Sequence, residues 1–237
     1  MSEKFIFDVD GTLTPSRGLI DLEFKSFFNS FCLMHDVYLV SGSDRPKTIE
    51  QLGEHTYNLC KRVYNCSGSE VYEQDKLIRA NVWNPPKKLY DIMNSWLEAS
   101  KFPLRMGNHI EERRGMINFS IVGRNCSAGE RGLYVKYDKE NRERETIAYI
   151  INSEFDDITA TVGGETGIDI APTGWDKSQI LTDFSYYDTI TFFGDRMDEK
   201  GNDFPLARAL VNGSYWKGKA VLVKDWRDTW EKLKEII

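Results

Sequence analysis

The sequence predicts an α/β protein in which a Rossmann-like core with a parallel sheet is interrupted by an inserted α+β unit. Strand and helix patterns alternate over the first 80 residues, change in the middle of the chain, and resume from about Trp175. Alternating strands and helices are typical of a parallel sheet with right-handed crossovers. We therefore expect one domain, residues 1–83 and 173–237, that is split by a second domain, residues 84–172.

The first part of the core is expected to contain two strand–helix pairs. "KFIFDVD" and "DVYLVSGSD" are short apolar strands that end in polar residues. "RPKTIEQLGEHTYNLC" is expected to be a helix, with Asp44 as its N-cap and Pro46 in its first turn. "LIDLEFKSFFNSFCLMH" has helical spacing, and its predicted apolar face consists of Leu19, Leu22, Phe27, Phe31 and Met34.

The middle segment has a different pattern. "PPKKLYDIMNSWLEASK" reads as a helix that opens with proline, and "GMINFSIVGR" and "ITATVGGETGIDIAP" read as antiparallel strands. The strands flank a charged helix, "DKENRERETIAYIINSEF", on which we expect Arg142 and Arg144 to be exposed. The core then resumes with helix "WDKSQILTDF", strand "TITFFGD", helix "NDFPLARAL", strand "KAVLVKD" and helix "WRDTWEKLKEII".

Composition excludes several classes of protein. The net charge of −6 argues against nucleic acid as a partner. No apolar run reaches about 18 residues and no signal-peptide pattern opens the chain, so we expect no membrane partner and a cytoplasmic location. The four cysteines form no C-x-x-C pair, which favours reduced thiols.

Polar clusters follow several core strands at their carboxyl ends, where α/β sheets bind ligands. Asp8 and Asp10 share one face of the first strand and repel each other, which favours a divalent cation beside them. Mg²⁺ prefers hard oxygen ligands, and Asp8 with Asp195 could supply two carboxylates. A carboxylate can also attack phosphorus and form an aspartyl-phosphate.

Three further residues fit phosphoryl chemistry. The Lys177 ammonium could spread the charge of a transferring phosphoryl group. The Ser41 hydroxyl and the Gly42 amide could hold phosphate oxygens. Taken alone, Lys177 could instead pair with Asp176 or cap a helix, and an Asp-x-Asp loop is more often a solvated turn.

The motifs resemble a known superfamily and, within it, a known family. "FDVDGTLT", "SGSD", "WDK" and "FGD" with "GND" resemble, in this order, the four motifs of the haloacid dehalogenase superfamily. "DVDGTLTPSR", "SGSDRPKTIEQLG", "RRGMINFSIVGR", "APTGWDKSQIL" and "FFGDRMDEKGND" resemble the eukaryotic-type phosphomannomutase family over nearly the whole chain. The resemblance implies a catalytic core with an inserted α+β cap.

The resemblance also implies roles for individual residues. Asp8 would be the nucleophile and Asp10 the general acid/base. The expected ligands of Mg²⁺ are Asp8, the Asp10 carbonyl, Asp195 and, in support, Asp203. The expected phosphate- and substrate-binding residues are Ser41, Lys177, Arg17, the cap residues Arg113, Arg124 and Arg131 for the distal phosphate, and Asp169 for a sugar hydroxyl.

The implied reaction interconverts mannose 6-phosphate and mannose 1-phosphate, with a hexose 1,6-bisphosphate that primes Asp8. Its product would supply GDP-mannose synthesis, and the resemblance implies a homodimer through the cap. Two alternatives remain: a sugar-phosphate phosphatase of the same superfamily, and a non-catalytic carbohydrate-phosphate binding protein.

The chain departs from the family pattern at three places. Gly167 stands where the family has Ser, "SGSE" replaces a Glu-Asn-Gly motif after the third strand, and Asp198–Asp203 replaces a Pro-Gly-Gly-Asn-Asp loop. These changes bear on sugar preference more than on phosphoryl chemistry. Arg113 and Arg114 point to opposite faces of a strand, so one is expected to be a surface charge, and Arg131 could be a solvated helix residue.

Overall fold

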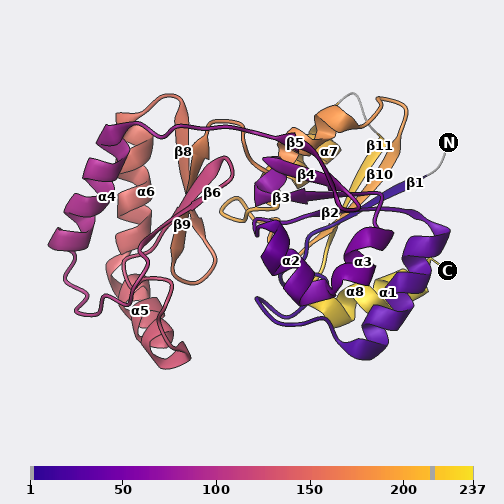
Figure 1. Ribbon diagram of the computed structural model, residues 1–237, viewed down its shortest axis with the longest axis horizontal. Coiled ribbons are helices and arrows are strands. Elements are labelled where there is room, and N and C mark those ends of the chain that lie inside the picture. Colours follow the sequence, from indigo (N-terminus) through magenta and orange to yellow (C-terminus); the bar gives the residue numbers. More distant parts are fainter. Residues whose placement is uncertain (1–2, 214–216, 237) are drawn as a thin grey trace. The chain divides into compact units, whose positions relative to one another are not determined.

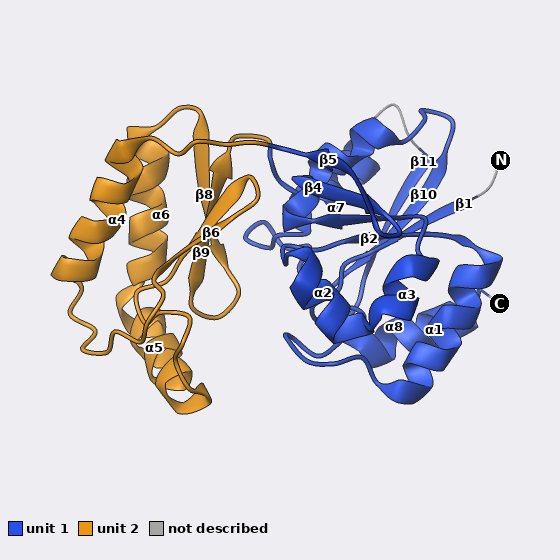
Figure 2. Cartoon of the chain, viewed as in Figure 1, with its two compact units in different colours: residues 1–81, 175–237 blue, residues 82–174 orange. Residues whose placement is uncertain are grey.

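The computed structural model describes residues 3–213 and 217–236. The chain forms two compact units (Figure 2): unit 1 is Met1–Asn81 with Trp175–Ile237, and unit 2 is Val82–Gly174. The sequence analysis placed the corresponding boundaries at 83/84 and 172/173. Among the described residues, no helix is both long and apolar enough to cross a bilayer.

Unit 1 contains a seven-stranded sheet in the order β11-β10-β1-β2-β3-β4-β5. The first five of these strands pair in parallel, and β4 and β5 add an antiparallel hairpin at one edge that the sequence analysis did not predict. The strands are β1 (Glu3–Phe7), β2 (Asp36–Val40), β3 (Arg62–Asn65), β4 (Glu70–Glu73), β5 (Lys76–Ala80), β10 (Thr189–Gly194) and β11 (Lys217–Leu222). The predicted fold class is confirmed.

Apolar cores cover both faces of this sheet, as a parallel sheet requires. Phe5 and Phe7 of β1 pack on one face against α1 (Leu22–Met34), α3 (Glu54–Leu59) and α8 (Trp226–Lys234), which lie together in Figure 1. Ile6, whose side chain points the other way, packs with residues of α7 (Phe204–Asn212) and of the 3₁₀ segment η2 (Lys177–Asp183). A second 3₁₀ turn, η1 (Cys66–Gly68), follows β3.

The predicted apolar face of α1 is largely wrong. The buried residues are Phe24, Phe28, Phe31 and Cys32, whereas Leu22 is 79% and Met34 57% exposed. The Asp21 side chain caps the helix by accepting from the amides of Glu23 and Phe24, so Leu19 lies before the helix begins. The spacing of the three buried aromatic rings, and not the flanking leucines, sets the face that packs on the sheet.

Three predicted helices differ in detail. The helix predicted over 45–60 is two helices, α2 (Arg45–Leu52) and α3, because Gly53 has a φ of +81°. Its predicted N-cap is confirmed, since the Asp44 side chain accepts from the Lys47 amide. The predicted charged helix is likewise divided at Arg142, whose φ is +53°, into α5 (Ala128–Asn141) and α6 (Glu143–Glu154). The helix predicted at 175–184 is the 3₁₀ segment η2.

Unit 2 is a four-stranded antiparallel sheet in the order β6-β7-β9-β8. Its strands are β6 (Ile110–Arg113), which was not predicted, β7 (Met116–Phe119), β8 (Ile158–Gly163) and β9 (Gly167–Pro172). One face, with Ile117 and Ile170, packs against α4 (Lys87–Ala99), α5 and α6 (Figure 1).

A polar row crosses the same sheet. Glu111 pairs with Asn118, Asn118 with Asp169, and Asp169 with Thr161. Residues that pair directly across strands share a face, so these four side chains lie on the face opposite the apolar core.

Candidate active site

A buried cluster of charges lies at the carboxyl end of β1. The Asp8 amide donates to the Phe193 carbonyl of β10 at 2.9 Å, which holds the backbone of the nucleophile candidate against the neighbouring strand. The Lys177 ammonium lies 2.5 Å from Asp8 Oδ1 and 2.6 Å from Asp203 Oδ1. Asp8, Lys177 and Asp203 are 3%, 1% and 0% exposed, so the ion pairs are shielded from water.

Asp8, Asp195 and Asp203 could hold a metal ion. Each of the three offers one carboxylate oxygen, and these oxygens lie within 4.8 Å of one another. Gly11, with a φ of +84°, leaves room for this set, because a Cβ there would lie 2.3 Å from Asp195 Oδ2. The donor set of hard oxygens fits Mg²⁺.

The electrostatics of the cluster favour a bound cation. Burial raises the pKa of the Asp8 carboxyl well above its ordinary value; Lys177 opposes this shift, and Asp203 and Asp195 add to it. Burial, and then the Asp203 carboxylate, raises the pKa of Asp195 to about 6. Although burial favours a neutral amine, Asp203 and Asp8 raise the pKa of Lys177 above its usual range. Three carboxylates therefore share the Lys177 ammonium, Arg196 adds a positive charge near Asp195, and a divalent ion would relieve the remaining excess of negative charge.

Asp10 is held beside this cluster by different contacts. Its carboxylate Oδ1 accepts from the Arg17 amide at 2.5 Å and from Gln51 Nε2 at 2.9 Å. Arg17 makes its contact with a φ of +58°, and its side chain is exposed. The three-carboxylate set does not include the Asp10 side chain, and the sequence analysis had expected only its carbonyl on the metal.

The other predicted phosphate-binding residues lie on the neighbouring strand. Ser41 follows β2, is buried, and donates its amide to the Tyr64 carbonyl at 2.8 Å. Its Oγ accepts from the Ser43 amide at 3.0 Å, and Gly42 lies between them. Thr12, which the sequence analysis did not single out, donates its hydroxyl to Asp8 Oδ2 at 3.4 Å.

Two of the three predicted cap arginines, Arg113 and Arg124, pair with an acid that sequence reasoning missed. Glu111 Oε2 lies 2.9 Å from the Arg113 guanidinium and 2.7 Å from that of Arg124. Although partial burial opposes ionisation, these two cations hold the pKa of Glu111 below its usual value. Arg131 lies on α5 and pairs with Glu165 at 3.5 Å. Glu111 lies two residues before Arg113, so on a strand both side chains share a face, and this spacing could have predicted their contact.

Asp169 is supported by Asn118, and two glycines leave room for the pair. Asn118 Nδ2 donates to Asp169 Oδ1 at 2.6 Å. A Cβ at Gly167 would lie 2.5 Å from Asn118 Nδ2, and a Cβ at Gly163 would lie 2.2 Å from Asp169 Oδ2. A side chain at 167 would therefore disturb the hydrogen bond between Asn118 and Asp169.

The expectation that Arg144 lies on an exposed helix face is wrong. Its guanidinium pairs with Asp138 at 2.8 Å and also donates to the carbonyls of Gly163, Gly164 and Gly167. The turn at Arg142 directs Arg144 toward the β8–β9 hairpin, whereas Arg142 itself is exposed.

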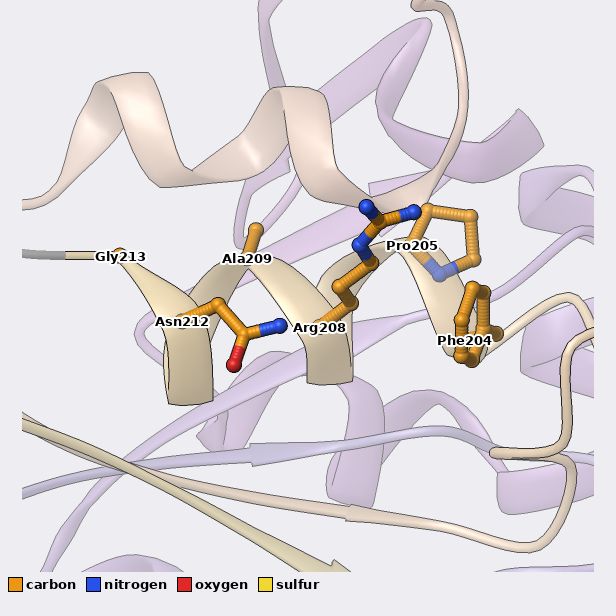
Figure 3. Close-up of a pocket in the computed structure, with 6 residues that line it drawn as sticks. All are labelled: Phe204, Pro205, Arg208, Ala209, Asn212 and Gly213. Carbon is orange, nitrogen blue, oxygen red and sulfur yellow. The ribbon is translucent and has the colours of Figure 1, made fainter.

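A hollow of about 520 Å³ lies along α7, lined by residues between Phe204 and Gly213 (Figure 3). Arg208 and Asn212 are its polar side chains, and it includes none of the carboxylates of the cluster. We assign it no part in the chemistry.

Comparison with solved structures defines the class. The C-terminal domain of trehalose-6-phosphate phosphatase from C. albicans superposes with a TM-score of 0.68 at 14% identity, over 99% of this chain and 91% of that one. A haloacid dehalogenase-like hydrolase from Bacteroides thetaiotaomicron superposes with a TM-score of 0.62 at 13% identity, over all of both chains. The fold is that of the haloacid dehalogenase superfamily.

Sequence comparison narrows the class to one family. The family model for eukaryotic phosphomannomutase matches residues 24–237. Phosphomannomutase of Spinacia oleracea is 34% identical, with 85% of this chain and 84% of that protein covered, and phosphomannomutase 1 of Dictyostelium discoideum is also 34% identical, with 85% of each covered. The chain belongs to the eukaryotic phosphomannomutase family, which confirms the resemblance. The matched range begins after Asp8, Asp10 and Arg17, so their assignment depends on the geometry above.

Proposed function

We propose that the protein is a phosphomannomutase, an enzyme that interconverts mannose 6-phosphate and mannose 1-phosphate. The observation that carries the proposal is the buried set Asp8, Lys177 and Asp203, with Asp195 beside it, in a chain of this family. A carboxylate paired with an ammonium in a water-excluded site suits attack on phosphorus.

In the proposed reaction, an Asp8 oxygen attacks one phosphorus of a hexose 1,6-bisphosphate. The bond from phosphorus to the sugar oxygen breaks, and Asp10 gives its proton to that oxygen. A hexose monophosphate then presents its free hydroxyl, Asp10 takes the hydroxyl proton, and the sugar oxygen displaces Asp8 from phosphorus. The bisphosphate that forms can return its other phosphate to Asp8, which completes the interconversion.

Asp8, Asp195 and Asp203 are proposed to hold Mg²⁺, together with the Asp10 carbonyl. When bound, Mg²⁺ would neutralise charge on the transferring phosphoryl group. Lys177 orients Asp8 through its 2.5 Å contact and supplies a second positive charge. The Ser41 hydroxyl and the Gly42 amide are proposed to bind the phosphoryl oxygens.

The polar face of unit 2 is proposed to bind the rest of the substrate. Arg113, Arg124 and Arg131 would hold the phosphate that is not being transferred, because forked guanidiniums suit a phosphate dianion. Asp169, oriented by Asn118, would accept a hydrogen bond from a sugar hydroxyl. Arg17 is proposed to contact the substrate through its exposed guanidinium.

The proposal also includes an activator, an oligomeric state, a metabolic role and a location. A hexose 1,6-bisphosphate is proposed as the activator that first phosphorylates Asp8. Family membership supports a homodimer through unit 2 and a role in supplying GDP-mannose synthesis, and the absence of a bilayer-spanning helix among the described residues is compatible with the cytoplasm. Light scattering would test the dimer, and cell fractionation would test the location.

A phosphatase of the same fold is the second candidate, in which water displaces Asp8 from phosphorus. The specific observation in its favour is Gly167, which lacks the hydroxyl of the family Ser. The guanidiniums gathered on unit 2 favour the mutase, because hydrolysis needs no second phosphate.

One assay distinguishes the two. Mannose 1-phosphate is incubated with Mg²⁺, with and without a catalytic amount of glucose 1,6-bisphosphate, while mannose 6-phosphate and free phosphate are followed. Mannose 6-phosphate that appears only with the bisphosphate would support the mutase. Free phosphate released at the same rate in both mixtures would reject it in favour of the phosphatase.

A further inference from the structure

Gln51 of α2 is a buried amide that lies in the segment "SGSDRPKTIEQLG" and to which the sequence analysis gave no role. It is 1% exposed, and its Nε2 donates to Asp10 Oδ1 at 2.9 Å, to Thr14 Oγ1 at 3.2 Å and to the Gly18 carbonyl at 3.4 Å. The orientation of the amide is fixed by Asp10, since the reverse would place an oxygen against the carboxylate. One side chain therefore contacts both ends of the segment from 10 to 18.

The backbone of Gln51 contributes to the same arrangement. The Ile20 amide donates to the Gln51 carbonyl at 2.9 Å, so the segment between Asp10 and Ile20 is joined to α2 twice. Asp10 Oδ1 also accepts from the Arg17 amide. Asp10 Oδ1 accepts both of the hydrogen bonds that described residues donate to this carboxylate, which leaves Oδ2 for a substrate proton.

A purely structural role explains Gln51 poorly. Gln51 Oε1 is buried and has no hydrogen-bond partner among the described residues. An unsatisfied buried acceptor costs about 1–3 kcal/mol, so a position needed only for packing would favour an apolar side chain. In Gln51, the unpaired Oε1 accompanies the hydrogen bond that Nε2 donates to Asp10 Oδ1.

We infer that Gln51 is a positioning residue that orients the Asp10 carboxylate for proton transfer. The inference deepens the proposed function, since it assumes that Asp10 acts as the acid/base. Gln51 holds Oδ1, and the acceptor hydroxyl gives its proton to Oδ2 as its oxygen forms a bond to phosphorus and the bond to Asp8 breaks. In the reverse direction, Oδ2 returns the proton to the departing sugar oxygen.

The reaction has two half-reactions, phosphorylation of Asp8 and transfer of the phosphoryl group to an acceptor. A change of phosphoryl donor can make only the second of them depend on Gln51. Acetyl phosphate has a leaving group that departs without a proton, so it can phosphorylate Asp8 without help from Asp10. Removal of the phosphoryl group by a hydroxyl acceptor still needs Asp10 as a base. A positioning defect should therefore slow the second step and leave the first unchanged.

The test uses Gln51→Met, which keeps the length of the side chain and removes its N–H donors. The full chain is loaded with acetyl phosphate and Mg²⁺, and decay of the aspartyl-phosphate is followed with mannose 1-phosphate and with water alone. We expect the loading rate within about twofold of the wild type and decay slowed at least about tenfold, a part of the 10²–10⁴ that acid–base catalysis supplies. Decay is measured per phosphorylated molecule, so misfolded protein does not contribute.

Thr229→Val is the matched control, because Thr229 is also fully buried in unit 1 but lies on α8. Its loading and decay should both match the wild type after correction for folded protein. Unchanged decay in Gln51→Met, or loading and decay that fall equally, would overturn the inference. Whether the wild-type aspartyl-phosphate transfers its phosphoryl group to the sugar or to water tests the proposed function. The Gln51 test is separate, because it compares the variant with the wild type on the same acceptor.

Discussion

Replacing Lys177 with methionine should make the stability of the protein strongly dependent on Mg²⁺. Lys177 pairs with both Asp8 and Asp203, at 2.5 and 2.6 Å, and it is fully buried. Methionine has a similar length and fills the space. The substitution leaves Asp8, Asp195 and Asp203 without their ammonium.

The size of the effect follows from burial. Two unit charges 4.8 Å apart repel by about 3.5 kcal/mol at an effective dielectric constant of about 20, and the cluster oxygens lie within 4.8 Å of one another. Removing one partner of a buried pair generally destabilises by about 3–5 kcal/mol. For a chain of this size that lowers the melting temperature by about 10 °C.

The assay is thermal melting of the wild type and the variant in EDTA and in saturating Mg²⁺. Because the ion binds the folded carboxylates, it should raise the melting temperature of Lys177→Met more than that of the wild type. Lowering the pH to about 5 should also reduce the defect in EDTA, because the crowded carboxyl groups then take up protons.

Arg144→Met is the matched control, since it removes the cation of a partly buried pair in unit 2, Arg144 with Asp138. It should lose stability that Mg²⁺ does not restore. The energy assigned to the contacts of Lys177 with Asp8 and Asp203 would be wrong under either of two outcomes. In the first, Lys177→Met has the same melting temperature as the wild type in EDTA. In the second, Mg²⁺ raises the melting temperatures of Lys177→Met and Arg144→Met equally.

Three other perturbations have defined outcomes. The pKa of Asp195 is raised from 3.8 to about 6, so its bound proton stabilises the metal-free fold fully below about pH 4, and this stabilisation is lost as the pH rises through 6. Over the same pH range, the affinity for Mg²⁺ should rise. Thermal melting with and without Mg²⁺ between about pH 5 and 8 measures both effects. Glu111→Gln removes the anion paired with Arg124, which is proposed to bind phosphate, so calorimetry should show inorganic phosphate binding about fivefold tighter, equivalent to ~1 kcal/mol. Gly167→Ser should lower the melting temperature by about 3 °C, because its Cβ displaces the Asn118 carboxamide, and the loss should be smaller in an Asn118→Ala background.

Sequence could predict that polar residues following neighbouring strands lie together, because sheet geometry fixes their positions. The carboxyl ends of parallel strands meet at one edge of a sheet, so Asp8 after β1 and Asp195 after β10 had to come together once the strands were identified. The Asp44 cap followed from local rules alone. These predictions needed no knowledge of how side chains pack.

The residues that sequence missed depend on tertiary contacts. Gln51 lies on a predicted helix, and its contact with Asp10 forms only when the loop after Asp10 folds against α2. Glu111 lies on a strand whose sequence, "IEER", lacks the β-branched alternation that would predict it. Arg144 was assigned to the surface because "KENRERE" is so charged, yet a single left-handed residue before it redirects the helix.

In the proposed reaction, the buried cluster does not select between a sugar and water as the acceptor, because Asp8 and Lys177 would neutralise and orient the phosphoryl group for either oxygen. Asp10 would serve both acceptors, so Gln51→Met should slow transfer to mannose 1-phosphate and to water by the same factor. The guanidiniums of unit 2 are proposed to bind the phosphate of a sugar phosphate, which water lacks. Arg124→Ala should therefore slow decay of the aspartyl-phosphate with mannose 1-phosphate and leave decay in water alone unchanged. Equal slowing of both would place Arg124 outside acceptor selection and remove the main physical reason for preferring the mutase to the phosphatase.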